Sequence, residues 1–469
     1  SRGRRELPAT RFIVEGDVEG LSKGGTFVGQ HILTPLHGVA VHINAFNFPC
    51  WGLLEKLAPA FLAGVPVIAK PATATAYVTE ALVRLMHESG ALVPGSLQLI
   101  CGPTGDLLDH LGGQDLIAFT GSIETSEKLR NHPNIAKHSI RFVAERDSLN
   151  ASLLGPDVDP SQPEFDLFVR EVVREMTVKT GQKCTAIRRV LVPRAQEAAV
   201  IAALKTALGA VKIGDPRTED KVMGPLVSRA QRDSVRGQIA KLKGEAEIVF
   251  GDPDRCEARG VDVQAGAFIG PVLLRATDPK TAQRVHDTEA FGPVATVMAY
   301  DTLDEAIELI QRGEGSLVAS VFTYDDSVAE AVLLGIAPFH GRVLIVDRDC
   351  AKESTGHGSP MPSLLHGGPG RAGGGEELGG LRAVYHYMQR TAVQASPARL
   401  SAITGTWMKG APAPRAEVHP FKRNFNELRV GDMIETASRP ITLDDIEHFA
   451  HFTGDTFYAH MDEAAAKAN

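Results

Sequence analysis

The chain has 469 residues, enough for two or three domains, and its 43% hydrophobic and 23% charged residues are typical of a globular protein with an ordinary core. The formal net charge of −8 argues against nucleic acid as the main partner, because phosphate binding needs concentrated positive charge. Five scattered cysteines without a CxxC pair argue against a disulfide framework and favour the reducing cytoplasm.

Residues 24–54 form a long stretch without Asp, Glu, Lys or Arg. It contains three histidines, two prolines and two asparagines, which a membrane-spanning helix would satisfy only at high cost. We therefore predict buried strands and an active-site loop here, and no membrane as partner. The chain starts with SRGRRELPATRF, which lacks an initiator Met and an apolar signal region and suggests the interior of a longer protein.

Short apolar runs alternate with amphipathic ones in the first third of the chain. The predicted strands are 38–43, 65–70, 96–102, 115–121 and 139–145. The predicted helices between them are 52–64, 75–90, 106–112 and 122–130. This alternation predicts a parallel sheet with helices on both faces. Ligands of such sheets bind at the carboxyl ends of the strands, where the loops open.

A second α/β region is predicted from about residue 150 to residue 380. Its predicted strands are 187–193, 294–300, 316–324 and 341–346, and its predicted helices are 165–181, 304–311 and 326–335. The glycine-rich segment 366–380 is a flexible loop by composition, and it lacks the Lys-Ser/Thr ending of a phosphate-binding loop. An extended strand at 391–396 and a proline-rich linker at 410–420 follow.

Three side chains stand at positions that favour chemistry. Cys184 follows a helix and a glycine turn, and the flanking Lys179, Lys183 and Arg188 would raise its thiolate fraction; the alternative is a buried, inert cysteine. Glu145 ends a predicted strand and would point into the ligand crevice; the alternative is a solvated glutamate. Asn47 follows the first strand of the parallel sheet and could donate to a developing oxyanion, unless it is simply a turn residue.

Several motifs in order resemble the aldehyde dehydrogenase superfamily over about residues 18–402. They are NFP after a strand, AKPA at Lys70, FTGS at Gly121 and Ser122, the strand-end Glu145, GQKCTA around Cys184, and EAFGPV at Glu289 and Phe291. The resemblance implies an α/β fold with a Rossmann-like parallel-sheet domain, an α/β catalytic domain and an oligomerisation arm.

The resemblance also implies a mechanism. Cys184 would attack an aldehyde carbonyl, with the oxyanion held by the Asn47 amide and the backbone N–H of Cys184. Hydride would leave to a nicotinamide, and Glu145 would activate the water that releases the acid. Lys70 and Glu289 would hold the cofactor riboses, with Phe291 in the same motif as Glu289.

Cofactor choice is predicted from one further position. Gly121 and Ser122 would lie against the cofactor phosphates at a helix start. Thr73 stands where relatives that prefer NAD often have a glutamate, and a threonine would not repel a 2′-phosphate. NADP is therefore the predicted cofactor, with NAD as the alternative. The resemblance suggests no metal.

The C-terminal part resembles the start of a MaoC-type hotdog domain, as in a bifunctional ring-opening subgroup of phenylacetate degradation. Thr442 is predicted to cap a helix with Asp444 and Asp445 in its first turn. Asp455 and His460 would activate water in an enoyl-CoA or oxepin-CoA hydration. Only 45 residues, 425–469, follow the linker, too few for a complete domain, so we expect a chain cut at both ends and this hydration half to be inactive.

The expected organisation divides the chain at the boundaries of these motifs. It comprises a remnant N-terminal segment and oligomerisation hairpin (1–36), an NAD(P)-binding domain lacking its N-terminal part (37–148), a catalytic thiol domain (149–385), an oligomerisation strand (386–403), a linker (404–424) and a partial MaoC-like hotdog segment (425–469). Exposed strands in such an arm pair with another subunit, which predicts a homo-oligomer, a dimer or a larger assembly such as a hexamer.

The predicted activity is NAD(P)-dependent oxidation of a semialdehyde linked to coenzyme A (CoA) to its carboxylic acid. The presence of Glu145 favours hydrolysis of the acyl-enzyme over transfer to CoA. Alternatives are a general semialdehyde dehydrogenase with a non-catalytic C-terminal segment and a catalytically silent assembly subunit. A cysteine hydrolase fits less well, because no histidine stands in a sequence context suited to its general base.

Overall fold

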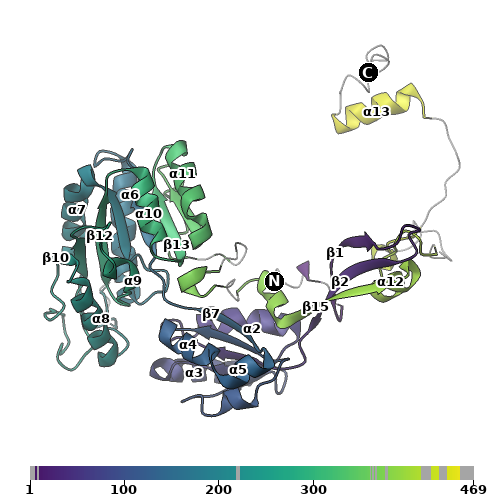
Figure 1. The fold of residues 1–469 in the computed structure, drawn as a ribbon, viewed down its shortest axis with the longest axis horizontal. Helices are drawn as coiled ribbons and strands as arrows, with labels where there is room; N and C mark the ends of the chain where they lie inside the picture. Colours follow the sequence, from purple (N-terminus) through teal and green to yellow (C-terminus); the bar gives the residue numbers. More distant parts are fainter. Residues whose placement is uncertain are drawn as a thin grey trace. The chain divides into compact units, whose positions relative to one another are not determined.

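The computed structural model describes residues 6–7, 10–217, 222–359, 361, 364, 367–374, 379–412, 424–432 and 441–454. These residues belong to two compact units. The larger unit contains the described residues of Ser1–Ile13 and Leu33–Arg390, and the smaller one those of Val14–Ile32 and Thr391–Asn469. Both large sheets lie in the larger unit (Figure 1).

The first large sheet is the predicted parallel sheet. Its strands are β3 (Ala40–Ile43), β4 (Val67–Lys70), β5 (Leu97–Leu99), β6 (Leu116–Thr120) and β7 (Arg141–Glu145). They are all parallel, in the order β5-β4-β3-β6-β7. All five predicted strands are confirmed. The chain moves from β3 to one side and returns through β6 on the other, so the crevice where ligands bind such sheets opens between the carboxyl ends of β3 and β6.

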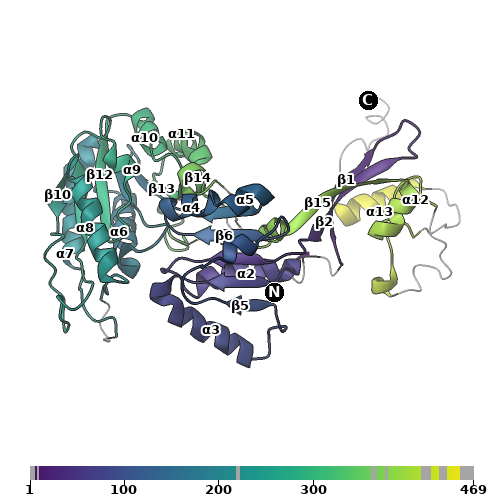
Figure 2. The same ribbon diagram turned by 60° about the horizontal axis from the view of Figure 1, so that its bottom comes forward.

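Helices cover both faces of this sheet, as Figure 2 shows. They are α2 (Trp51–Ala63), α3 (Ala76–Glu88), α4 (Ile123–Arg130) and α5 (Pro133–His138), with short 3₁₀ turns η1 (Thr73–Thr75) and η2 (Leu107–His110). Leu53 and Leu57 of α2 pack with Ala40 and Val67 on one face, whereas Leu129 of α4 packs on the other. Burial on both faces explains why the strands read as continuous apolar runs. Two details differ from the expectation: residues 107–110 are a 3₁₀ turn and α5 is additional.

The second large sheet has seven strands, β8 (Ala151–Leu154), β9 (Arg189–Pro193), β10 (Ala246–Phe250), β11 (Val272–Ala276), β12 (Val294–Tyr300), β13 (Ser316–Phe322) and β14 (His340–Val346). Their order is β10-β11-β12-β9-β8-β13-β14, and only the edge strand β10 is antiparallel to its neighbour. The four strands predicted in this region are confirmed, whereas β8, β10 and β11 were not predicted.

Six helices flank the seven-stranded sheet, α6 (Pro163–Thr177), α7 (Glu197–Gly209), α8 (Arg229–Leu242), α9 (Arg284–Asp287), α10 (Leu303–Gln311) and α11 (Asp326–Ile336). Phe168 of α6 and Leu204 of α7 pack with Val190 on one face, and Ile239 of α8 and Leu309 of α10 pack on the other. Helices α7, α8 and α9 were not predicted. The two apolar layers hold the sheet rigid and so fix the loops at its edges.

A three-stranded sheet contains β1 (Ile13–Gly20), β2 (Val28–Pro35) and β15 (Met388–Ala395), in the order β1-β2-β15. It brings together the two segments that were predicted to form the oligomerisation arm. Helix α12 (Pro397–Thr404) follows, and its Leu400 packs with Val28 and Met408. The homo-oligomer itself stays a prediction.

The described part of the C-terminal segment contains the 3₁₀ turn η9 (Phe425–Glu427) and α13 (Leu443–Thr453). The predicted helix start is confirmed, because the Thr442 hydroxyl accepts the Asp445 N–H at 3.3 Å. These residues do not show a hotdog fold. Asp455 and His460 lie outside the described residues. No described helix has the length and apolar character to cross a membrane.

Candidate active site

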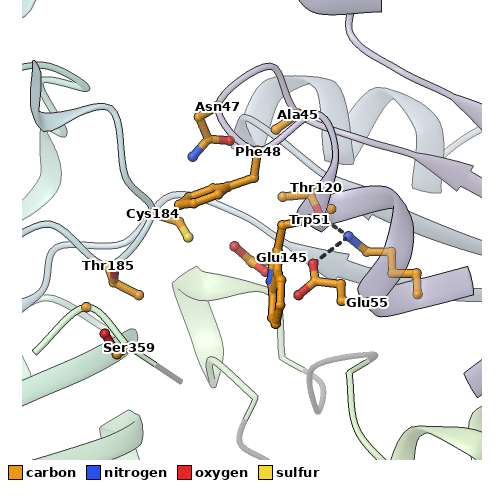
Figure 3. A pocket seen from close by; sticks show the side chains of 13 residues that line it. Ala45, Asn47, Phe48, Trp51, Glu55, Thr120, Glu145, Cys184, Thr185 and Ser359 are labelled. Atoms are coloured by element: carbon orange, nitrogen blue, oxygen red, sulfur yellow. Dashed lines mark hydrogen bonds and ion pairs between the residues drawn. The ribbon is translucent and has the colours of Figure 1, made fainter. Parts of the chain in front are cut away.

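One cavity of about 340 Å³ brings together side chains from both large sheets. Its lining residues are Ala45, Asn47, Phe48, Trp51, Gly52, Glu55, Lys56, Thr120, Glu145, Cys184, Thr185, Gly358 and Ser359. Figure 3 shows Asn47, Glu145 and Cys184 around this cavity. The structure therefore brings together the three side chains that were predicted to carry the chemistry.

Two opposite strand edges meet at the cavity. Asn47 follows the carboxyl end of β3, and Thr120 and Glu145, which face each other in register, end β6 and β7. Cys184 instead precedes the amino end of β9, on the seven-stranded sheet. The parallel sheet supplies the amide and the carboxylate because its strand ends open into the crevice.

An unusual backbone presents Cys184. Lys179, Thr180 and Gly181 have positive φ angles of 53°, 56° and 67°, so the chain turns sharply after α6. A Cβ on Gly181 would lie 2.1 Å from the carbonyl oxygen of Gly292, so no side chain fits there. Left-handed conformations at two non-glycine residues are costly and are often found at functional sites.

Asn150 fixes the backbone on both sides of Thr185, at Cys184 and Ala186. Its side-chain Nδ2 donates to the carbonyl oxygens of Cys184 at 2.8 Å and Ala186 at 2.9 Å. Its Oδ1 accepts the Ser148 hydroxyl at 2.6 Å and the Val318 N–H at 3.1 Å. Asn150 has no exposed surface. The backbone at Cys184 is therefore tied to the start of β8 and to β13, a restraint that the sequence analysis missed because its partners are far apart in the chain.

The three cations that flank Cys184 in sequence have different surroundings. Lys183 Nζ contacts both carboxylate oxygens of Glu175 at 2.7 Å, and the Arg188 guanidinium contacts Glu289 at 3.2 Å. Lys179 Nζ donates to the carbonyl oxygen of Asn47 and lies 3.6 Å from the centroid of the neighbouring Phe48 ring. Two of the three charges are thus largely balanced by buried carboxylates, and only Lys179 supports the Asn47 loop.

Glu145 sits where a carboxylate is hard to ionise. Loss of hydration, assisted by the negative charge of Glu55, raises its pKa above the ordinary value, while Lys56 and a hydrogen bond with the Cys184 thiol act in the opposite direction. A carboxyl group with a raised pKa is a stronger base once ionised than an exposed glutamate.

Two charged residues of α2 that the sequence analysis did not select also line the cavity. Lys56 is 4% exposed, and its Nζ lies 2.8 Å from the Thr120 hydroxyl and 3.4 Å from the Glu55 carboxylate (dashed in Figure 3). Glu55 and Lys56 are the first charged residues after the uncharged stretch 24–54. Their position at the end of that stretch was the sequence feature that could have marked them as site residues.

The residues predicted to hold a cofactor lie at the carboxyl edge of the parallel sheet. Lys70 ends β4, and Thr73 follows it at the start of η1 with an exposed side chain. Among the residues that the structure describes, no carboxylate pairs with Lys70. A cation and a hydroxyl close together at this edge suit the hydroxyls or the 2′-phosphate of an adenosine ribose.

Gly121 and Ser122 stand at the start of α4, as predicted, but other groups already engage this helix end. The Ser122 hydroxyl accepts the Thr125 N–H at 3.3 Å, and Asp147 Oδ1 accepts the Ile123 N–H at 3.1 Å. A cofactor phosphate would therefore approach a helix start that the Asp147 carboxylate already contacts. The sequence motif around Gly121 and Ser122 did not indicate this contact.

Glu289 and Phe291 precede β12 and face the parallel sheet. Glu289 receives Arg188 Nε and the Ser148 N–H, and burial raises its pKa to about 7. The Phe291 ring packs edge to face against Phe46, with ring centroids 5.8 Å apart. Phe46 lies in the loop after β3, so this pair also joins the two sheets. No group of three His, Cys, Asp or Glu suited to a metal ion occurs in the described part of the chain.

The fold and this cavity are typical of a class of dehydrogenases, and comparison with known proteins agrees. The sequence profile of the aldehyde dehydrogenase family matches residues 17–393. The chain belongs to this family.

Two relatives and one solved structure show which members of the family this chain is similar to. A 3,4-dehydroadipyl-CoA semialdehyde dehydrogenase of Aromatoleum evansii is 50% identical over 370 residues, which are 79% of this chain and 72% of the relative. Protein MaoC of Klebsiella aerogenes is 47% identical over 245 residues, 52% of this chain and 71% of that protein. Betaine aldehyde dehydrogenase of Staphylococcus aureus, solved in complex with NAD+, superposes with a TM-score of 0.70 at 26% identity, over 82% of this chain and 71% of that one.

Proposed function

We propose that the protein oxidises a CoA-linked semialdehyde to the corresponding carboxylic acid, with a nicotinamide cofactor as the oxidant. The observation that carries the proposal is the convergence of Cys184, Glu145 and Asn47 on one cavity. The similarity to a relative named for a CoA semialdehyde supports the substrate class. The apolar walls formed by Phe48 and Trp51 suit the hydrocarbon chain of such a substrate.

Cys184 carries the covalent step. Its sulfur, as the thiolate, forms a bond to the aldehyde carbon, the carbon–oxygen π bond breaks, and the carbonyl oxygen takes the negative charge. The side-chain amide of Asn47 is positioned to donate to that oxygen, which lowers the barrier because the donor is already fixed. Lys179 keeps Asn47 in place by binding its backbone carbonyl. A bound nicotinamide would supply the hydride acceptor, and departure of the hydride from the aldehyde carbon would leave a thioester on Cys184.

Glu145 completes the cycle. Its carboxylate takes a proton from water, and the water oxygen adds to the thioester carbon. The carbon–sulfur bond then breaks, the acid leaves, and the thiolate of Cys184 is restored. The raised pKa of Glu145 suits this role, because it makes the ionised carboxylate a stronger base than an exposed glutamate.

The proposed cofactor is NADP, with NAD as the alternative. Lys70 and Thr73 would hold the adenosine ribose, and Thr73 presents no negative charge to a 2′-phosphate. Gly121 and Ser122 would lie near the phosphates, and Glu289 near the second ribose. Because Asp147 engages the start of α4, its carboxylate has to share that helix end with the phosphates or move away from it.

Steady-state oxidation of 6-oxohexanoyl-CoA with NADP+ tests the proposal. Cys184→Ala should abolish activity, whereas the control Cys101→Ala, which alters an exposed cysteine outside the cavity, should not. Glu145→Gln should still reduce about one equivalent of cofactor per chain and then turn over about 10²–10⁴-fold more slowly, because only the release of the acid needs the base. Equal activity of Cys184→Ala and the parent chain would disprove the proposal.

The proposal extends to the C-terminal segment only as a prediction. Asp455 and His460 would serve as acid and base of a hydration site. We expect no hydration of crotonyl-CoA by this chain; hydration that is lost in His460→Ala would refute the expected inactivity and support the role of His460, separately from aldehyde oxidation.

A further inference from the structure

A second cavity lies beside the first, on the outer face of α6. It measures about 220 Å³, and we call it the arginine cleft. Leu167, Phe322 and Leu344 give it an apolar floor, and its polar lining is Arg170, Glu171, Arg174 and Ser354. The two arginines stand four residues apart on one helix, so their side chains lie on the same face. The cleft thus combines an apolar surface with two adjacent guanidinium groups.

The guanidinium groups of this cleft are largely available to a ligand. Both arginines are exposed, and Arg170 pairs with no carboxylate among the residues that the structure describes. Arg174 approaches Glu171 at 3.6 Å, a long ion pair with a half-exposed guanidinium. The other Glu171 oxygen accepts the His357 N–H at 2.7 Å, so this carboxylate is shared between two donors.

A single loop joins the arginine cleft to the catalytic cavity. Ser354 and Gly356 line the cleft, whereas Gly358 and Ser359 line the cavity that contains Cys184. A Cβ on Gly356 would lie 2.6 Å from Arg174 Nη1, so the loop passes close against the arginine. Gly356 and Gly358 are two residues apart, which spans at most about 7 Å of chain.

The catalytic cavity is too small for a whole CoA thioester. Its volume of about 340 Å³ is at the lower end of the range for sites that enclose drug-sized ligands. The acyl chain can enter it, but the nucleotide of CoA has to remain outside. The pantetheine arm of CoA is long enough to cross the loop between the two cavities.

We propose that the arginine cleft binds the phosphorylated nucleotide end of the CoA thioester whose aldehyde end reaches Cys184. Arg170 and Arg174 would bind the phosphates, since a planar guanidinium forms paired hydrogen bonds with phosphate oxygens. The apolar floor would accept the adenine ring, and the Ser354 hydroxyl is available as a further donor. This assignment rests on the proposed oxidation of a CoA-linked semialdehyde.

Charge reversal at both arginines separates this subsite from the aldehyde site. For Arg170→Glu with Arg174→Glu, we expect kcat/KM for 6-oxohexanoyl-CoA to fall at least about tenfold, mainly through KM. Activity with hexanal, which has no phosphate, should stay within about twofold of the parent chain. The matched control is Lys205→Glu with Lys241→Glu, which changes the charge equally at exposed helix positions outside both cavities.

A direct binding measurement completes the test. Calorimetric titration with free CoA should show binding that weakens at least about tenfold in the arginine double variant and that weakens with added salt. Equal losses with 6-oxohexanoyl-CoA and hexanal, or no loss with either, would overturn the assignment. If the parent chain oxidises neither aldehyde, the proposed function fails, and the CoA titration still decides whether the arginine cleft binds the nucleotide.

Discussion

Replacing Lys183 by methionine tests the buried ion pair next to Cys184. Lys183 Nζ lies 2.7 Å from both carboxylate oxygens of Glu175, and the two side chains are 9% and 1% exposed. At an effective dielectric constant of about 20, unit charges at this separation attract each other by about 6 kcal/mol. Most of that attraction offsets the cost of removing both groups from water. The intact pair therefore adds little net stability. Removal of one partner alone is costly, because it leaves the other charge buried and unpaired.

Lys183→Met should lower the free energy of unfolding by roughly 3–5 kcal/mol, because it leaves Glu175 buried without its cation. The midpoint of thermal unfolding, Tm, should fall by roughly 4–6 °C, given the entropy of unfolding of a unit of this size. Burial already raises the pKa of Glu175, so the variant carboxyl group should take up a proton in the folded state. A pKa raised by folding means that stability is lost as pH rises, so the drop in Tm should be larger at about pH 8 than at about pH 5.

The matched control is the double variant Lys183→Met with Glu175→Leu. It removes both charges and should recover most of the lost stability. It should also leave the pH dependence of Cys184 alkylation nearly unchanged, since the charge of Lys183 is already balanced by Glu175. Thermal unfolding by circular dichroism and iodoacetamide kinetics measure the two effects. A double variant no more stable than Lys183→Met alone would refute the reasoning.

Three further predictions follow from contacts at the site. Glu55→Gln should shift the acidic limb of the pH–rate profile to lower pH, because the negative charge of Glu55 helps to raise the pKa of Glu145; an unmoved limb would contradict this. Thr73→Glu should lower kcat/KM for NADP+ by about tenfold or more and leave that for NAD+ nearly unchanged, and steady-state kinetics with both cofactors measure the ratio. Asn150→Ala should cost roughly 1–3 kcal/mol of stability and slow Cys184 alkylation, because two backbone carbonyls lose their donor; normal alkylation in a folded variant would show that Asn150 does not position the thiol.

The parallel sheet could be predicted from the sequence because each strand is a short apolar run closed by a turn, and each crossover is an amphipathic helix. The seven-stranded sheet was harder. Strand β8 is only four residues long, and its SLNASLL surroundings show no helical or alternating period. Helix α7, EAAVIAALKTALG, has apolar residues on most of its faces, so periodicity does not separate it from a strand region.

The residues of the candidate site also differ in whether the sequence could indicate them. Cys184, Glu145 and Asn47 could be selected because each stands in a motif at the end of a predicted element. Asn150 and Asp147 could not, since their partners lie in other elements and the contacts depend on how the two sheets pack. The positive φ angles at Lys179 and Thr180 had no signal either, because neither residue type favours the left-handed region.

Because the cavity lies where two strand edges from different sheets meet, the site can form only when both sheets are in place. Neither sheet alone contains both Cys184 and Glu145, so the proposed site needs both sheets packed together. The surroundings of the Cys184 thiol described above form only with that packing. The rate of Cys184 alkylation during refolding should therefore follow the packing of the two sheets, whereas far-UV circular dichroism should follow their secondary structure.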